Sequence, residues 1–484
     1  MNIPRCMSTQ HPDNASIPFF SSSPVLAGET EVREAYYAFS HLGCDEQMWD
    51  VEGKEIDTHV VKKLFTFYDA YFRERPLGES LRLTLRVPNP AVEFAESKIL
   101  LETLETIPRW FDTARIFYGR EIAPVYEVIL PMTTNARELE RIGAYYRDFI
   151  VGRQDRKLLP GDITVSDWVG ATGPDSIQVI PLFEDLPSML GAAKILETYL
   201  RGKEIADQRV FLAKSDTAMN YGLASAALSN KVALYEIDQL SEKTGMRLHP
   251  IMGTGAAPFR GWLSPHHTVE VCTEYPSVAT FTVQSAFKYD YPHDEVRAAI
   301  AILRERMPGR AVPIARERVQ ELIDRYSPVY RASVVKLASQ INAMSRYVPA
   351  RRARKLHVGL FGYARDMEGV QLPRAISFTC ALYSLGIPPE LLGFESLRSE
   401  DLQFLEKAHP SFHRKVMMAM RYCDLDSPLM PEGLRSALQR AGYDWEPDKE
   451  HIAITRQMRA LSHGSDAAMA DLLLRAARLR RFLG

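Results

Sequence analysis

The sequence predicts an α/β fold, a (β/α)8 TIM-type barrel with additional C-terminal helices. Eight short runs of β-branched and apolar residues recur along the first three quarters of the chain, with helix-period segments between them. From Pro389 to Gly484 the pattern becomes almost wholly helical. Because short strands that alternate with helices are typical of a closed parallel sheet, these observations together favour a barrel that carries a helical extension.

The eight runs are each expected to form one strand of the barrel. They are Ala35–Leu42, Leu81–Val87, Pro124–Pro131, Ile177–Phe183, Gln208–Lys214, Leu248–Met252, Val278–Gln284 and Leu356–Gly362. Helices are expected at Pro90–Thr106, Asn135–Val151, Ser188–Arg201 and Asp294–Arg306, where the apolar residues follow helical spacing. Pro90 suits the first position of its helix, because a proline there loses no hydrogen bond.

The chain is expected to divide into three parts. Residues 1–34 form an N-terminal segment that contributes to the active site, residues 35–386 form the barrel, and residues 387–484 form a helical extension packed on the barrel. A length of 484 residues suits this division, since a barrel can run beyond ~250 residues as a single unit.

Composition excludes several classes of protein. The 59 lysines and arginines against 61 aspartates and glutamates give a net charge of −2, which predicts no nucleic-acid partner and no membrane partner. We find no run near the ~20 apolar residues of a membrane span and no signal peptide. The cysteines are scattered and odd in number: Cys6, Cys44, Cys272, Cys380 and Cys423. We therefore expect a cytoplasmic enzyme in a reducing compartment.

Acidic residues follow two consecutive runs. Glu184 and Asp185 follow the first run and Asp216 follows the second. Because neighbouring parallel strands lie ~4.8 Å apart, such carboxylates can share a hard divalent cation. Strand alternation lets only one of Glu184 and Asp185 face the barrel interior, and alternation alone does not choose between them. Ordinary loop acids or helix N-caps are the alternative interpretation.

Basic and glycine-rich segments also follow the runs. A guanidinium binds carboxylate and phosphate bidentately, so several arginines at one barrel mouth suit a small polyanion. The candidates are Arg86, Arg260, Arg365 and Arg374. The loop MGTGAAPFRG at 252–261 is neither a dinucleotide fingerprint nor a P-loop. Its free backbone amides can cradle an oxyanion, although a plain tight turn explains it equally well.

The histidines give no independent catalytic motif. His409 and His413 lie four residues apart, but Pro410 interrupts the helix between them and no HExxH glutamate is present, so a zinc site is not expected. His11 lies in STQHPDN, far from any expected element. The absence of GxSxG disfavours nucleophilic acyl chemistry.

Long segments of the chain resemble the archaeal type of phosphoenolpyruvate carboxylase, over roughly residues 1–400. In order, these segments are MSTQHPDN, FSHLGCDEQMWDVEGKE, LRLTLRVPNP, VIPLFED, FLAKSDTAMNYG and MGTGAAPFRG. The resemblance implies a (β/α)8 barrel with extra helices, in agreement with the pattern above.

The resemblance to the longer bacterial and plant members of the family implies roles for single residues. The segment T-Q-H-P-D-N is similar to the one that carries their catalytic histidine, which points to His11. The segment P-L-F-E is similar to the one that carries their metal-binding glutamate, which points to Glu184 rather than Asp185. K-S-D-T is similar to the segment of their metal-binding aspartate and points to Asp216.

The same resemblance implies a set of substrate-binding groups. Arg86, Arg260 and Arg374 are similar in setting to arginines of the long forms and are assigned with the catalytic residues. The lysine that follows the metal-binding aspartate in the long forms is Met219 here, and Lys214 is its possible substitute. The remaining substrate-binding candidates are Gly253, Thr254 and Gly255 of the glycine-rich loop.

The resemblance implies that phosphoenolpyruvate and bicarbonate give oxaloacetate and phosphate through carboxyphosphate and enolpyruvate, with Mg²⁺ (or Mn²⁺) as cofactor, in a homotetramer. An apolar wall that keeps CO₂ from water is expected, with Met252 and Phe259 as candidates. Two alternatives remain open. One is another metal-dependent barrel enzyme acting on phosphoenolpyruvate or pyruvate, a lyase or a phosphotransferase, and the other is a non-catalytic barrel that senses a metabolite.

Overall fold

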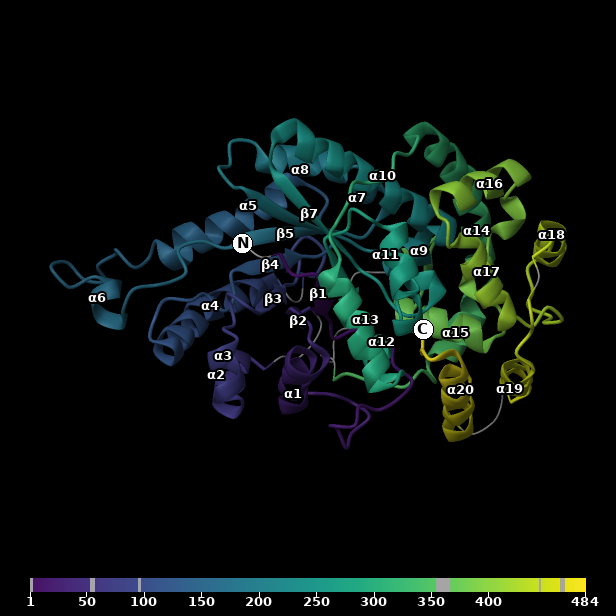
Figure 1. Ribbon diagram of the computed structural model, residues 1–484, viewed down its shortest axis with the longest axis horizontal. Helices are drawn as coiled ribbons and strands as arrows, with labels where there is room; N and C mark the ends of the chain where they lie inside the picture. Colours follow the sequence, from purple (N-terminus) through teal and green to yellow (C-terminus); the bar gives the residue numbers. More distant parts are fainter. Residues whose placement is uncertain (1–2, 53–56, 95–96, 354–365, 444, 462–465) are drawn as a thin grey trace.

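A computed structural model describes residues 3–52, 57–94, 97–353, 366–443, 445–461 and 466–484, and it contains a closed barrel of eight parallel strands (Figure 1). The strands are β1 (Cys6–Ser8), β2 (Glu46–Asp50), β3 (Arg82–Arg86), β4 (Glu127–Leu130), β5 (Gln178–Phe183), β6 (Asp207–Leu212), β7 (Arg247–Met252) and β8 (Thr280–Val283). They follow one another around the barrel in chain order, and β8 pairs with β1 to close it. The predicted fold class is therefore confirmed.

Six predicted strands are confirmed, namely those that correspond to β3, β4, β5, β6, β7 and β8. The strand predicted at Ala35–Leu42 is wrong, because helix α1 (Glu29–Tyr37) continues there into the π-helix η1 (Ala38–Leu42). Its buried apolar residues recur at helical spacing, as in Val32, Ala35 and Phe39. The strand predicted at Leu356–Gly362 lies outside the described residues. The first strand of the barrel, β1, precedes the expected start at residue 35.

Helices surround the barrel (Figure 1). The longer ones that follow the strands are α4 (Ser97–Tyr118), α5 (Ala136–Tyr145), α8 (Ala192–Leu200), α10 (Leu223–Thr244) and α13 (His293–Glu305), and the shorter ones before α4 are α2 (Val60–Phe67) and α3 (Asp69–Glu74). Pro90 does not begin a helix as predicted, because α4 starts at Ser97. The Asn89 side chain accepts a hydrogen bond from the amide of Ala91 at 2.9 Å and holds these residues in a turn.

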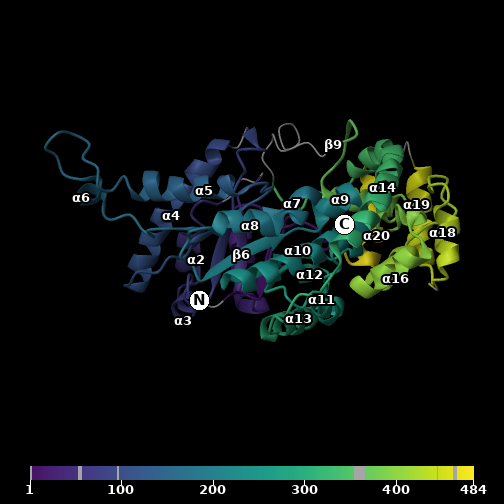
Figure 2. The same ribbon diagram turned by 90° about the horizontal axis from the view of Figure 1, so that it is seen from above.

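The C-terminal helices lie together on one side of the barrel (Figures 1 and 2). They are α14 (Arg316–Ser345), α15 (Ala375–Ser384), α16 (Ser399–Ala408), α17 (Phe412–Arg421), α18 (Leu434–Ala441), α19 (Lys449–Ala460) and α20 (Asp466–Arg480). A second apolar core, which includes Tyr330, Phe378 and Leu473, joins them to α10. Within the described residues, we find no single helix long and apolar enough to cross a membrane.

The barrel interior has a charged layer and an apolar layer. Arg209 donates hydrogen bonds to Glu46 at 2.6 Å and to Glu127 at 3.0 Å, and Arg82 donates to Glu127 at 2.8 Å. All four side chains are buried, and their charges balance. The apolar layer consists of Met7, Met48, Ile129, Ile180, Leu182, Phe211 and Ile251. Because side chains alternate along each strand, the same inward rows continue toward the C-terminal ends of the strands.

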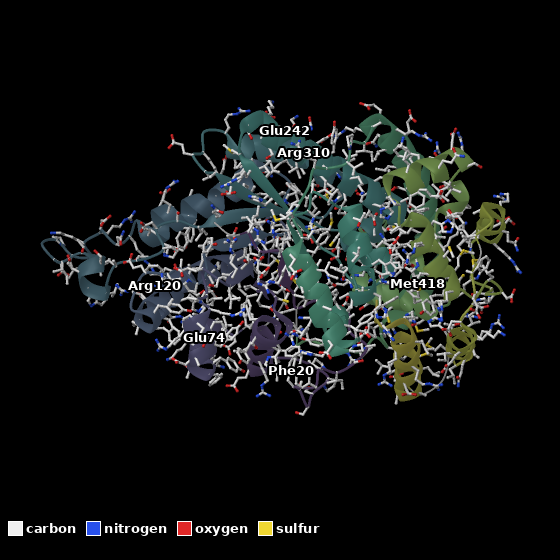
Figure 3. All side chains as sticks on the ribbon, viewed as in Figure 1. Phe20, Glu74, Arg120, Glu242, Arg310 and Met418 are labelled. Carbon is white, nitrogen blue, oxygen red and sulfur yellow. The ribbon has the colours of Figure 1, made fainter. Side chains whose placement is uncertain are left out.

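We predict that Glu46→Gln lowers the free energy of unfolding by about 3–5 kcal/mol, because it leaves two buried guanidinium groups to share the single carboxylate of Glu127. Urea unfolding followed by circular dichroism measures the change. Glu79→Gln is the matched control, since Glu79 binds Arg120 at 2.7 Å on the exposed surface (Figure 3), where ion pairs contribute little. Equal effects of the two substitutions would contradict this account.

Candidate functional site

A cavity of about 570 Å³ opens at the C-terminal ends of the strands. Eight of the ten predicted site residues line it: His11, Arg86, Glu184, Lys214, Asp216, Gly253, Arg260 and Arg374. Residues separated by more than 350 positions in the chain, such as His11 and Arg374, therefore meet in one place. Arg365 lies outside the described residues.

The two acids at the end of β5 have different surroundings. Glu184 lines the cavity and accepts a hydrogen bond from the amide of Met132 at 2.7 Å. Asp185 instead caps helix α7 (Leu186–Leu190), where its side chain accepts from the amide of Ser188 at 2.7 Å. The structure thus distinguishes the acids that strand alternation left open, and Asp185 follows the N-cap interpretation.

Glu184 lies beside other negative charges. Asp216, in the first turn of α9 (Ser215–Tyr221), follows β6, the strand next to β5. Burial, together with the negative charges of Asp216 and Glu52, raises the pKa of Glu184 to about 8. A divalent cation between Glu184 and Asp216 would relieve this repulsion, so the donor set fits one.

The described residues contain no group of three or more histidine, cysteine, aspartate or glutamate side chains arranged to hold a metal ion. Two carboxylates nevertheless suit Mg²⁺, which typically takes one or two protein carboxylates and completes its shell with water and substrate oxygens. Glu184 and Asp216 therefore suit a hard metal ion whose remaining coordination positions are filled by substrate and water. They do not form a structural site in which the protein supplies every metal ligand.

Arg86 is held by carboxylates that the sequence analysis missed. Asp50 accepts two hydrogen bonds from Arg86, each at 2.8 Å, and Glu52 lies 3.2 Å from the same guanidinium. Asp50 lies at the end of β2, on the inward row that begins with Glu46. Since β2 was not predicted as a strand, its alternation could not be used to find Asp50.

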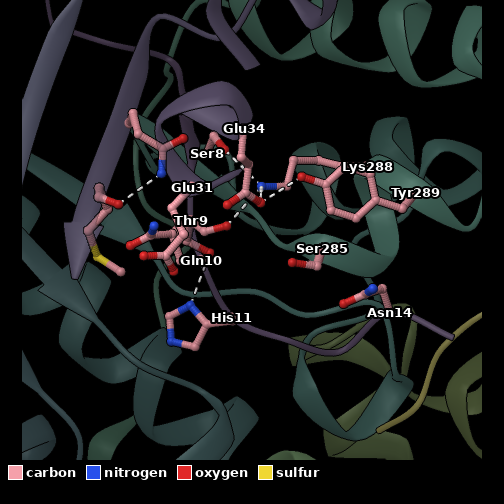
Figure 4. A network of polar contacts seen from close by, with 12 residues as sticks. Ser8, Thr9, Gln10, His11, Asn14, Glu31, Glu34, Ser285, Lys288 and Tyr289 are labelled. Atoms are coloured by element: carbon pink, nitrogen blue, oxygen red, sulfur yellow. Dashed lines mark hydrogen bonds and ion pairs between the residues drawn. The ribbon is translucent and has the colours of Figure 1, made fainter. Parts of the chain in front are cut away.

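His11 lies just beyond β1, at one end of a network of buried charged residues (Figure 4). Its Nδ1 is 3.0 Å from Thr9 Oγ1. Lys288 donates to the carbonyl of Thr9 at 2.9 Å and pairs with Glu34 at 2.9 Å. Burial opposes the charge on Glu34, but the positive charges of Arg352 and Lys288 lower its pKa below the ordinary value. This network fixes the backbone that carries His11.

Arg260 joins four parts of the chain. It is fully buried, and it donates to Ser215 Oγ at 3.0 Å, to Gln284 Oε1 at 2.6 Å and to the Gly484 carbonyl at 2.7 Å. It also lies 3.3 Å from Asp13. Arg260 therefore touches the cavity with a guanidinium that is already strongly held.

Thr254 and Gly255 shape the glycine-rich loop and do not line the cavity. The amide and hydroxyl of Thr254 each form a 2.9 Å hydrogen bond with Thr282. A Cβ atom at Gly255 would lie 2.9 Å from the guanidinium of Arg260, so only glycine leaves room for it. Of the three loop residues predicted to bind substrate, only Gly253 lines the cavity.

Lys214 is backed by two further buried lysines. Its ammonium donates to the hydroxyl of Tyr275, and Lys231 lies over the same ring at 4.4 Å. Lys415 pairs with Glu274 at 3.3 Å. Burial, with the positive charges of Lys415 and Lys231, lowers the pKa of Lys214 well below its ordinary value. A bound anion at this side of the cavity would favour the charged form of Lys214.

Met252 and Phe259, the residues predicted to form an apolar wall, do not line the cavity, so this prediction is wrong. Met252 is the last residue of β7 and faces the outer core, because Ile251 before it faces the barrel interior. Phe259 packs beside Phe378 in the core of the C-terminal helices. The apolar side chains that line the cavity include Leu182 and Phe211.

Glu390 is a buried acid that holds the loop carrying Arg260. It accepts hydrogen bonds from the amide of Phe259 at 2.7 Å and from the hydroxyl of Tyr383 at 2.8 Å. Burial raises the pKa of Glu390 from its ordinary value of 4.5 to about 7. Its contribution to stability is therefore complete below pH 4.5 and is lost as the pH rises through 7.

We predict that the free energy of unfolding of the unsubstituted protein falls by roughly 3 kcal/mol more than that of Glu390→Gln between pH 4.5 and pH 8. Urea unfolding at a series of pH values measures the difference. Two parallel stability curves would show that Glu390 does not titrate in this range.

The whole chain matches proteins of one family. A family model described as phosphoenolpyruvate carboxylase matches residues 3–484. The chain is 55% identical to the phosphoenolpyruvate carboxylase of Methanothermobacter thermautotrophicus, 48% identical to that of Methanospirillum hungatei and 46% identical to that of Pyrococcus furiosus, in each case over 100% of both chains. Family model and full-length relatives agree, and the chain belongs to the phosphoenolpyruvate carboxylase family, in its archaeal type.

Proposed function

We propose that this chain carboxylates phosphoenolpyruvate with bicarbonate and releases oxaloacetate and phosphate. The observation that carries the proposal is one cavity in which Glu184 and Asp216 lie on neighbouring strand ends, together with Lys214, Arg374 and His11. This arrangement occurs in a chain that matches curated phosphoenolpyruvate carboxylases along its whole length.

Glu184 and Asp216 are the residues that would hold the divalent ion, Mg²⁺ or Mn²⁺. This assignment is supported by the burial and the neighbouring negative charges that raise the pKa of Glu184 to about 8. Bound there, the ion would neutralise substrate oxygens and stabilise the enolate oxygen as negative charge develops on it.

Cationic side chains would hold the phosphoryl and carboxylate groups of the substrate. Lys214 and Arg374 border the cavity from the end of β6 and from the N-terminus of α15. Arg86 reaches it from β3, where Asp50 fixes the plane of its guanidinium. Arg260 closes the cavity near Gln284. Fixed guanidinium groups bind phosphate and carboxylate without reorganising.

The proposed reaction proceeds in three steps. A bicarbonate oxygen attacks phosphorus, and the bond from phosphorus to the enol oxygen breaks, which gives carboxyphosphate and the enolate of pyruvate. Carboxyphosphate loses its hydroxyl proton and separates into CO₂ and phosphate, which takes up the proton. The methylene carbon of the enolate then forms the new carbon–carbon bond with CO₂, in a pocket where Leu182 and Phe211 limit the access of water.

His11 would accept the proton that carboxyphosphate loses. Thr9 Oγ1 holds the Nδ1 side of its ring at 3.0 Å, so Nε2 is the atom assigned to receive the proton. The near-neutral pKa typical of a histidine permits both uptake and return. We also carry the family expectation of a cytoplasmic homotetramer as part of this proposal.

Oxaloacetate formation coupled to malate dehydrogenase tests the function. We expect activity that requires phosphoenolpyruvate, bicarbonate and Mg²⁺ together. Consumption of phosphoenolpyruvate that continues without bicarbonate and forms no oxaloacetate would identify another barrel lyase or phosphotransferase. Binding of phosphoenolpyruvate with no turnover would identify a sensing barrel.

We predict that His11→Asn still cleaves phosphoenolpyruvate and releases phosphate, while oxaloacetate formation falls by about 10²-fold or more, because a positioned proton acceptor typically contributes that factor. Parallel assays of phosphate and oxaloacetate measure the split. Full carboxylation by the variant would remove His11 from the mechanism.

We predict that Asp216→Asn sharply raises the metal concentration needed for half-maximal activity and weakens Mn²⁺ binding measured by electron paramagnetic resonance. Asp185→Asn is the matched control, because Asp185 is an adjacent carboxylate that caps α7. Unchanged Mn²⁺ binding in Asp216→Asn, or equal loss in both variants, would reassign the ligand.

A further inference from the structure

A segment that we call the arm, residues 152–173, extends away from the barrel between η3 (Tyr146–Val151) and β5, and it carries the short helix α6 (Val165–Val169) (Figures 1 and 2). None of the residues 152–172 is buried. The side chains of this segment stand clear of the rest of the molecule (Figure 3). The arm therefore has no core of its own.

Backbone and capping hydrogen bonds give the arm a defined shape. The amide of Val165 donates to the carbonyl of Arg156 at 2.9 Å, and the amide of Ser166 donates to that of Gln154 at 2.9 Å. Thr164 and Asp167 form a reciprocal capping box at the start of α6. The two limbs are thus held together although no apolar packing supports them.

The arm concentrates exposed apolar side chains. Six of the sixteen exposed large apolar residues of the described chain lie at its base or along it: Phe149, Leu158, Leu159, Ile163, Trp168 and Val169. Trp168 is 66% exposed and Leu159 is 65% exposed. Together they present on the order of 600 Å² of apolar surface, at or above the largest patch of a typical monomer.

The mixed charges of the arm suit contact with a second copy of the arm. Arg156 and Lys157 carry positive charge on one limb, whereas Asp162 lies near the tip and Asp155 beside them. Within the described residues, none of these four side chains forms an ion pair. A balanced surface does not suit a nucleic acid or an anionic membrane, but two copies related by a two-fold axis can pair its opposite charges reciprocally.

We propose that the arm binds a second copy of this chain across a two-fold axis. Exchange of two arms would cover on the order of 1,200 Å² of apolar surface, which reaches the size of a stable interface, about 1,200–2,000 Å² in total. Helices α4 and α2 lie on the same side of the barrel as the arm (Figure 1). Near their ends they carry Ile116, which is 80% exposed, and Phe67, which is 54% exposed. This inference does not depend on the proposed reaction.

Sedimentation velocity of the full chain over a range of concentrations tests the proposal. The variant Trp168→Asp combined with Leu159→Asp places charges in the apolar surface of the arm. We expect the mass of the main species to fall to half or less, and the dissociation constant to rise at least roughly thirtyfold, the effect of losing one interface hot spot. The far-ultraviolet circular dichroism spectrum of the folded state should stay unchanged, because neither side chain is buried.

Met307→Asp is the matched control, since Met307 is 79% exposed but lies outside the arm. It should leave the mass unchanged. The proposal is overturned if the unsubstituted chain is a monomer at every concentration, if the arm variant keeps its mass, or if Met307→Asp lowers the mass equally. Activity is not the readout, so failure here is distinct from failure of the proposed reaction.

Discussion

The barrel depends on a charge balance in its interior. Arg209 and Arg82 meet Glu46 and Glu127 away from water, where either charge alone would be costly. These side chains come from β2, β3, β4 and β6, so their pairing constrains how the strands register around the barrel. Because Asp50 and Arg86 lie further along the inward rows of Glu46 and Arg82, their positions follow from this pairing. The charged layer supports the site without touching it.

At the mouth, two groups of like charge border the cavity. The carboxylates of Glu184 and Asp216 crowd one side, whereas Lys214 has further lysines behind it on another. A cation beside the clustered carboxylates and a small polyanion beside the clustered lysines would each reduce the repulsion between like charges. The N-terminal segment completes the wall, because Glu34 and Lys288 hold the backbone before His11. Binding and catalysis then use groups fixed by the fold.

The sequence pattern predicted the fold class and six strands, but not β1 and β2. β1 is only three residues long, and Glu46 and Asp50 place charges on the inward row of β2. An apolar run as short as Ala35–Leu42 does not separate helix from strand. Strand alternation predicted that only one of Glu184 and Asp185 faces the barrel interior, but it did not say which. The hydrogen bond by which Asp185 caps α7 shows that Glu184 is the inward residue. Arg86 pairs with Asp50 of the neighbouring strand, and a pattern within one segment of sequence does not show which strands are neighbours.

The most direct test of the central claim follows the oxygen atoms of bicarbonate. If bicarbonate attacks the phosphoryl group in this cavity, heavy-oxygen-labelled bicarbonate transfers one labelled oxygen to the released phosphate, and the other two reach oxaloacetate with the new carboxylate carbon. Mass spectrometry of both products in a rapid reaction measures the distribution. Phosphate without label would mean that water or another acceptor takes the phosphoryl group, and it would contradict the proposed carboxylation route.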